Sequence, residues 1–224
     1  MVNSKNAFWQ ALVFTILVFG IGLVFGFFLE TSRSESIQNN LMNSEINLLD
    51  NQIRNKIIDD LNVHCDLAVK SSFDFADEIY SEAILLEKYD SSDKFGDSLI
   101  LLHKRYDLLR TLLWIENIKL KERCNFDFHT VIYLYEYKTK DIELKSKQKF
   151  YSRILTDLKN KYPEKILLIP ISANSNLESL ELLISKYELF ETPNIFVDEE
   201  KMITSIVTFN ELENIVFEAN KQYK

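Results

Sequence analysis

The sequence is poor in glycine and proline, and this shortage excludes several classes of protein. Among 224 residues there are 4 glycines and 3 prolines, where average usage would give roughly 16 and 11. Collagen-like chains, flexible Gly/Ser linkers and Pro-rich disordered segments are therefore excluded. The net charge of −8 argues against a nucleic-acid partner, because phosphate binding needs clustered lysine and arginine.

The few glycines and prolines are unevenly placed along the chain. Gly20, Gly22 and Gly26 lie in one apolar run, and all three prolines lie in the last third. Residues 30 to 162 contain no proline. Because proline interrupts helices, this stretch indicates long, unbroken helices.

Residues 7 to 29 form an apolar run without a single charged side chain. A helix of this length measures roughly 34 Å, enough to cross a hydrocarbon core of about 30 Å. The run is also longer than the apolar region of a cleaved signal peptide. We therefore expect an uncleaved transmembrane anchor. A signal cleaved near Ser32-x-Ser34 is the alternative.

The charges beside this run predict its orientation. Lys5 precedes it, whereas Glu30, Arg33 and Glu35 follow it, and the next basic residue is Arg54. The positive-inside rule then predicts a single-pass protein of the cell membrane, with a cytoplasmic N-terminus and an extracytoplasmic body.

Two glycines in the run have the spacing of a helix-packing motif. Gly22 and Gly26 could let two membrane helices approach closely and form a homodimer. Glycine is also common in membrane helices without such a role, and this alternative stays open.

Residues 30 to 126 carry the apolar periodicity of helices and predict an all-α hairpin or bundle. The apolar positions are Ile37, Leu41, Leu48, Leu49, Ile53, Ile57 and Leu61 in a first stretch, Val69, Phe73, Ala76, Tyr80, Ala83 and Leu86 in a second, and Phe95, Leu99, Leu102, Tyr106, Leu109, Leu113, Trp114 and Ile118 in a third. We expect these side chains to form the core of this region, because no polar ligands suited to a cofactor are interspersed among them.

The period changes near residue 129, where dense β-branched and aromatic runs begin. The pattern predicts strands at 131–135, 165–172, 194–198 and 202–207, and helices at 142–162, 177–189 and from Thr208 onward. Thr208-x-x-Glu211 fits a capping box at the start of the last helix. The expected fold is α/β, in the order β-α-β-α-β-β-α around a four-stranded mixed sheet.

This order, with Thr192-Pro193 directly before the third strand, resembles the thioredoxin-like fold over residues 127 to 221. The resemblance implies a strand order of 2-1-3-4 and a cis Pro193 that faces the family's active site. It also implies that the second strand lies at an edge, which agrees with Pro170, since proline is tolerated at sheet edges. A trans proline that opens a strand is the other interpretation of Pro193.

The chemistry of active thioredoxins is missing from this chain. They carry Cys-x-x-Cys between the first strand and the next helix, whereas residues 136 to 143 read EYKTKDIE and contain no cysteine. Disulfide exchange needs a thiolate nucleophile, so we expect no catalytic residue, cofactor or metal here. The sequence favours a non-enzymatic, redox-inactive module that binds or scaffolds an unknown protein partner through the surface around Thr192-Pro193 and Lys138 to Lys149.

Cys65 and Cys124 are the only cysteines. In an exported body an even pair favours a disulfide; two separate buried thiols are the alternative. A divergent thiol-disulfide oxidoreductase or chaperone that uses these two residues is a second functional hypothesis. A Cys2His2 metal site with His64 and His129 is not expected, because zinc-type spacing is absent.

A local excess of positive charge follows the first strand. Residues 138 to 161 hold eight lysines or arginines against three acidic residues. The candidate basic surface consists of Lys138, Lys140, Lys145, Lys147 and Lys149. It could dock an acidic partner or lipid headgroups, or it could be an ordinary solvated helix face.

The chain is thus expected to have three parts. Residues 1–29 form a short cytoplasmic tail and the anchor, residues 30–126 a helical region, and residues 127–224 the thioredoxin-like domain. A third functional hypothesis is an oligomeric structural component of the membrane, assembled through the anchor and the helices.

Overall fold

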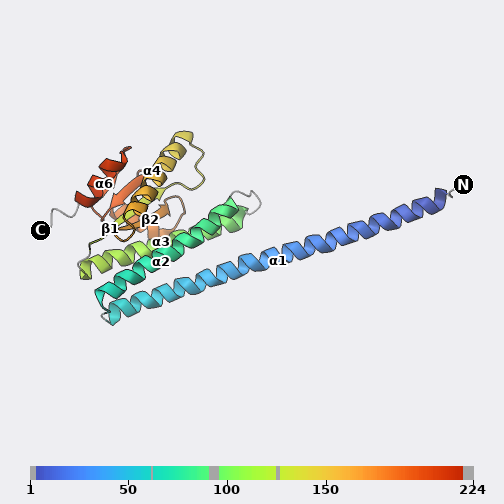
Figure 1. Cartoon of the computed structure of the whole chain (residues 1–224), viewed down its shortest axis with the longest axis horizontal. Helices are drawn as coiled ribbons and strands as arrows, with labels where there is room; N and C mark the ends of the chain where they lie inside the picture. The colour runs from blue at the N-terminus through green and yellow to red at the C-terminus, as the bar shows by residue number, and fades with distance from the viewer. Residues whose placement is uncertain (1–3, 62, 91–95, 125–126, 219–224) are drawn as a thin grey trace. The chain divides into compact units, whose positions relative to one another are not determined.

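The computed structural model describes residues 4–61, 63–90, 96–124 and 127–218 (Figure 1). The chain divides into two compact units, Met1–Gln52 and Ile53–Lys224. Helix α1 (Ser4–Asp60) supplies the described part of the first unit and continues into the second.

The first unit contains the expected apolar helix. Phe8–Thr31 has a mean hydropathy of 2.7, and none of it is buried within the chain. By length and composition this segment can cross a membrane. A Cβ added at Gly22 or Gly26 would meet no atom within 4 Å, so no contact among the described residues requires glycine at either position.

The second unit begins with a helical layer. Residues 53–60 of α1 lie beside α2 (Cys65–Asp90) and α3 (Gly96–Arg123). Arg54 Nη1 donates to the carbonyl of Ser71 at 3.1 Å, and the Asn55 side-chain amide donates to Glu116. These contacts link the end of α1 to both helices of the hairpin, so the structure contains the predicted all-α region.

The predicted helical core is right for α3 and wrong in part for the other two helices. Leu99, Tyr106, Leu109, Leu113 and Trp114 of α3 are buried. The side chains of Ile37, Leu41, Leu86 and Phe95 lie outside the described residues. The other differences are that Leu49, Ile53, Ile57, Leu61 and Tyr80 are exposed, and that α2 buries Ala68, Ser72, Phe75 and Ile79.

A buried polar pair explains the different face of α2. The hydroxyl of Ser72 and the amide of Asn117 hydrogen-bond at 2.9–3.0 Å. Because a buried polar group needs a partner, this pair turns the Ser72 side of α2 inward, one residue away from the predicted apolar stripe.

The α/β region contains the predicted order of elements. They are β1 (His129–Tyr135), α4 (Ile142–Lys161), β2 (Ile166–Ser172), α5 (Glu178–Lys186), β3 (Asn194–Val197), β4 (Lys201–Ile203) and α6 (Phe209–Glu218). The sheet order is β2-β1-β3-β4. β1 pairs in parallel with β2 and antiparallel with β3, and β4 is antiparallel to β3. The expected mixed sheet and its strand order are confirmed, with Pro170 in the edge strand β2.

Local signals explain where the helices begin. Asp141 Oδ1 accepts from the amides of Glu143 and Leu144 at 2.9 and 3.2 Å and caps α4. At α6, the amide of Thr208 donates to Glu211 Oε2 at 2.7 Å, and the amide of Glu211 donates back to Thr208 Oγ1 at 3.3 Å. This reciprocal pair is the predicted capping box.

Strand β4 ends at Ile203, four residues earlier than predicted. Its last pair joins Ile203 to Ile195, and Pro193, close to the start of β3, has no N–H to extend a ladder. The carbonyl of Ser205 instead accepts from the hydroxyl of Tyr151 at 2.6 Å. The chain after β4 is therefore tied to α4 rather than to the sheet.

The sheet is covered on both faces (Figure 1). α4 and α6 pack on one face, where Tyr151, Leu155, Leu158, Leu212 and Val216 are buried against the strands. The α2–α3 hairpin covers the other face together with α5. There Trp114 stacks on Tyr187 at 5.7 Å and meets Phe196 edge-on at 6.3 Å. The helical hairpin is thus part of the core of the α/β region.

Candidate functional site

The turn after β1 and the loop before β3 meet at one end of the sheet. Leu134, near the end of β1, pairs with Asn194, the first residue of β3. Directly beyond this pair, the hydroxyl of Thr192 donates to Glu136 Oε1 at 2.8 Å. The Thr192–Pro193 peptide bond is cis, as the resemblance implies, and Pro193 is buried.

Hydrogen bonds fix the turn that follows β1. The amide of Tyr137 donates to Asn174 Oδ1 at 2.9 Å, and Asn174 Nδ2 donates to the carbonyl of Tyr137 at 3.0 Å. Gln148 of α4 donates to the carbonyl of Glu136 at 3.1 Å. Lys138, the next residue, has φ 53°. The turn is therefore held by groups from α4 and from the loop after β2.

Helix α3 supplies polar side chains at the same end of the sheet. The ring of His103 lies 3.9 Å from that of Tyr137 between centroids. Asp107 is buried and accepts from the amide of Ser172 at 3.1 Å and from Arg110 at 3.4 Å. Burial raises the pKa of Asp107 to about 6, although Arg110 and the Ser172 amide act in the opposite direction.

Sequence reasoning did not find this group on α3. His103 and Asp107 lie on a helix more than sixty residues before Ser172, and no local motif connects them. Only the packing of α3 against β2 brings them to the end of the sheet.

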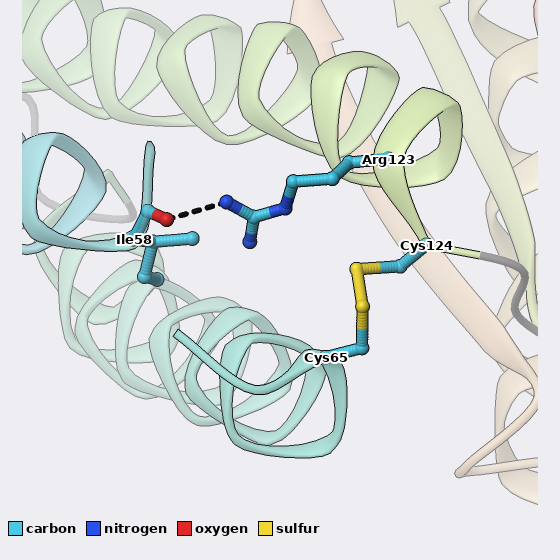
Figure 2. Close-up of a disulfide and its surroundings, with 4 residues drawn as sticks. All are labelled: Ile58, Cys65, Arg123 and Cys124. Atoms are coloured by element: carbon cyan, nitrogen blue, oxygen red, sulfur yellow. Dashed lines mark hydrogen bonds between the residues drawn. A yellow bond between two sulfur atoms is a disulfide. The ribbon is translucent and has the colours of Figure 1, made fainter. Parts of the chain in front are cut away.

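Cys65 and Cys124 form a disulfide (Figure 2). Cys65 opens α2 and Cys124 directly follows α3, with 5.9 Å between their Cα atoms. Beside the bond, Arg123 donates to the carbonyl of Ile58. The disulfide therefore closes the helical hairpin at its open ends, next to the last turns of α1, and the predicted pairing is confirmed.

The disulfide limits the catalytic and metal-binding roles considered for these two cysteines. A bonded cysteine cannot act as a thiolate nucleophile or as a zinc ligand until the bond is reduced. Within the described ranges, no group of three or more His, Cys, Asp or Glu residues could hold a metal ion. His129, which belonged to the alternative metal set, lies against Asp198.

A second polar cluster lies at the opposite end of the sheet, where β1 begins and β3 ends. Asp198 accepts from His129 Nδ1 at 2.6 Å, from the amide of Thr130 at 2.9 Å and from Lys121 Nζ at 2.5 Å. Glu199 accepts from Trp114 Nε1 at 2.9 Å. These carboxylates attach α3 to the β3–β4 turn, a role that sequence reasoning did not detect.

Two opposing effects set the pKa values in this cluster. Burial alone would raise the pKa of Asp198, but hydrogen bonds from His129 and Lys121 hold it below its ordinary value. Burial raises the pKa of Glu199 despite the nearby Lys121 and the hydrogen bond from Trp114. Asp198 therefore favours its charged form, whereas Glu199 favours its neutral form relative to a free carboxyl.

Four of the five lysines of the predicted basic surface have exposed side chains, in the turn after β1 and in the first half of α4. Lys138 and Lys140 lie in the turn, and Lys145 and Lys149 lie one helical turn apart on α4, whereas Lys147 is partly buried beside the ring of Tyr151. None of the five forms an ion pair with a carboxylate in the part of the chain that the structure describes. Ile142, in their midst, is 81% exposed.

The four exposed lysines are thus positive charges that form no ion pair with any described residue, and they surround an apolar side chain. Asp141 lies among them, but its carboxylate is engaged with the amides that begin α4. The arrangement can attract a negatively charged surface and offer it one apolar contact.

Comparison with protein-family models gives no match, and a search of curated proteins finds no related sequence.

Proposed function

We propose that this chain is a membrane-anchored, redox-inactive module with a thioredoxin-like α/β domain that binds or scaffolds a protein partner. Residues 8–31 would anchor it, with the N-terminus in the cytoplasm and the body outside. The Cys65–Cys124 disulfide supports an extracytoplasmic body, because disulfides persist in oxidising compartments.

Topology supports the thioredoxin-like part of the proposal. The order of elements and the strand order β2-β1-β3-β4 match the pattern that the resemblance implies. α4 and α6 share one face of the sheet, and Pro193 directly precedes β3 at the expected end.

One observation carries the binding role: the Glu136–Thr192 hydrogen bond occupies the place where the family's chemistry would occur. The turn after β1 supplies a carboxylate instead of a thiol, and its partner is the residue before Pro193. Both cysteines are bonded to each other at the base of the helical hairpin. This end of the sheet therefore presents a surface formed by the turn after β1 and the segment before Pro193, without a nucleophilic thiol.

The exposed apolar residues near this end favour contact with a protein. Ile142 is 81% and Phe190 70% exposed, and they lie on the two segments that the Glu136–Thr192 hydrogen bond joins. Large side chains exposed beside a polar rim are typical of interaction surfaces.

A reductase assay on the full chain tests the redox part of this proposal. We expect no turnover of insulin disulfides above the rate with dithiothreitol alone. Turnover that is lost on replacing Cys65 or Cys124 by serine would instead establish the oxidoreductase hypothesis.

A photo-cross-linking amino acid tests the binding part. Placed at Ile142 in the native membrane, it should yield a defined adduct, whereas the same group at Lys70, an exposed residue of α2, should not. Equal labelling at both positions, or none at Ile142, would contradict the proposal.

A further inference from the structure

Two surfaces of opposite charge lie on different helices of the α/β domain. The basic face is made of Lys138, Lys140, Ile142, Lys145 and Lys149. The acidic face is made of Glu178, Glu181, Leu182, Glu188, Phe190 and Glu191. All of these side chains are exposed.

The basic face keeps its charge because its lysines have no carboxylate partner among the described residues. The ammonium of Lys138 lies 5.2 Å from the centre of the Tyr137 ring, a contact that leaves the charge in place. Lys145 and Lys149 point from the same side of α4, since they are four residues apart on a helix.

The acidic face is formed by α5 and the segment after it. Glu178 and Glu181 lie in the first turn of α5, and Glu188 and Glu191 flank Phe190. Lys186 is the only basic residue between positions 178 and 191. Leu182 and Phe190 are 72% and 70% exposed, so this face also combines uncompensated charge with apolar contact area.

We infer that the basic face of one copy binds the acidic face of a second copy, so that two anchored chains associate side by side. Each face offers what the other lacks: an excess of opposite charge around exposed apolar side chains. In a two-fold dimer each copy uses both faces, and the two contacts are equivalent. The inference rests on the proposed binding role of the Lys138–Lys149 surface and names its partner.

The same observations disfavour a lipid as the occupant of the basic face. Ile142 lies between Asp141 and Glu143. Inserting it into an anionic membrane would bring two carboxylates into the negative headgroup layer. A protein surface can instead place its carboxylates beside the lysines and leave Asp141 and Glu143 at the solvated rim.

The membrane anchor makes a weak contact between copies effective. Copies held by parallel anchors meet in a plane at high local concentration, so even weak contacts become occupied. The contact needs neither Gly22 nor Gly26, and it therefore differs from an association through the membrane helix.

Variants that reverse the charge of one face or the other provide the test. Full-length donor- and acceptor-labelled chains are reconstituted in phosphatidylcholine vesicles, and energy transfer between copies is measured. We expect transfer for the wild type and at least about a tenfold weaker association for K145E/K149E and for E188K/E191K, because each places like charges opposite one another. A one-to-one mixture of the two variants should restore transfer, since every contact is then complementary again.

Matched variants separate this effect from general changes in charge or folding. K56E/K70E reverses two exposed lysines of α1 and α2 and should associate like the wild type. The quadruple variant K145E/K149E/E188K/E191K should also associate, which keeps the test decisive if one double variant folds poorly. No transfer for the wild type, unchanged transfer for the double variants, or no recovery in the mixture would each overturn the inference. Insulin turnover in the separate reductase assay would instead reject the proposed function.

Discussion

Asp198 Oδ2 lies 2.6 Å from His129 Nδ1, although the two residues are 69 positions apart in the sequence. Asp198 has left β3 with φ 51°, which turns its carboxylate back toward the start of β1. The same carboxylate accepts from Lys121 of α3. A single side chain thus joins the helical hairpin, β1 and the β3–β4 turn.

Replacement of Asp198 by alanine should destabilise the body by about 3 kcal/mol, because it leaves three donors, one on α3 and two in β1, without their charged acceptor. Urea unfolding of the full chain in detergent micelles, followed by near-ultraviolet circular dichroism, measures this change. Glu200→Ala, an exposed change in the same turn, should cost less than about 0.5 kcal/mol. Equal effects of the two variants would show that the cluster does not join these elements.

Asp107 should make stability depend on pH in the opposite sense from Asp198. A carboxyl whose pKa is raised to about 6 in the folded chain binds a proton more tightly than in the unfolded chain. Its contribution to stability therefore falls as the pH rises from about 4 to about 6. The full effect corresponds to about 3 kcal/mol.

The variant Asp107→Asn isolates this effect because it cannot titrate. The unfolding free energy of the variant minus that of the wild type should rise by up to about 3 kcal/mol between about pH 4 and pH 7. A constant difference across this range would show that Asp107 has an ordinary pKa in the folded chain.

Removal of the disulfide should destabilise the body by about 4 kcal/mol, the loop-closure effect of a bond between residues 59 positions apart. Cys65→Ser/Cys124→Ser and the wild type in dithiothreitol should unfold alike, and dithiothreitol should leave the double variant unchanged. A loss below about 1 kcal/mol would mean that packing of α2 and α3 alone holds the hairpin.

Much of this architecture follows from local patterns in the sequence. The apolar run of residues 7–29, the alternation of strands and helices after residue 129, the capping box at Thr208 and the even pair of cysteines each carry their own signal. They predicted the membrane-length helix, the order of elements and the disulfide. The strand order came from the resemblance to a known family.

The polar contacts could not be predicted because they join residues far apart in sequence. Glu136 and Thr192 are 56 residues apart, and Trp114 and Glu199 are 85 apart. Glu199 lies in the β3–β4 turn with no local signal for a partner, and only the docking of α3 brings Trp114 to it. The inward face of α2 was misassigned for a related reason, since the Ser72–Asn117 pair overrides the apolar stripe.

The anchor should hold the chain in the membrane. After alkaline carbonate washing the full chain should stay with the membrane pellet, whereas a chain lacking residues 8–31 should be released, because it loses the only described segment that can span the bilayer.

Protease added to intact cells should cut the body if it is extracytoplasmic. An N-terminus mapped near residue 34 would instead reveal a cleaved signal.

The Glu136–Thr192 contact should control the order of the turn after β1. Glu136→Ala removes the acceptor of the Thr192 hydroxyl and should weaken the local structure by about 1 kcal/mol, the net value of one hydrogen bond. Amide exchange of residues 137–141 should then become about fivefold faster. Glu136→Gln keeps an acceptor oxygen and should restore most of the protection, whereas Glu143→Ala, an exposed change at the start of α4, should leave exchange in the turn as in the wild type. Unchanged exchange in Glu136→Ala would mean that Asn174 and Gln148 alone hold the turn. The conformation of the proposed binding surface would then depend on these two residues and not on Thr192.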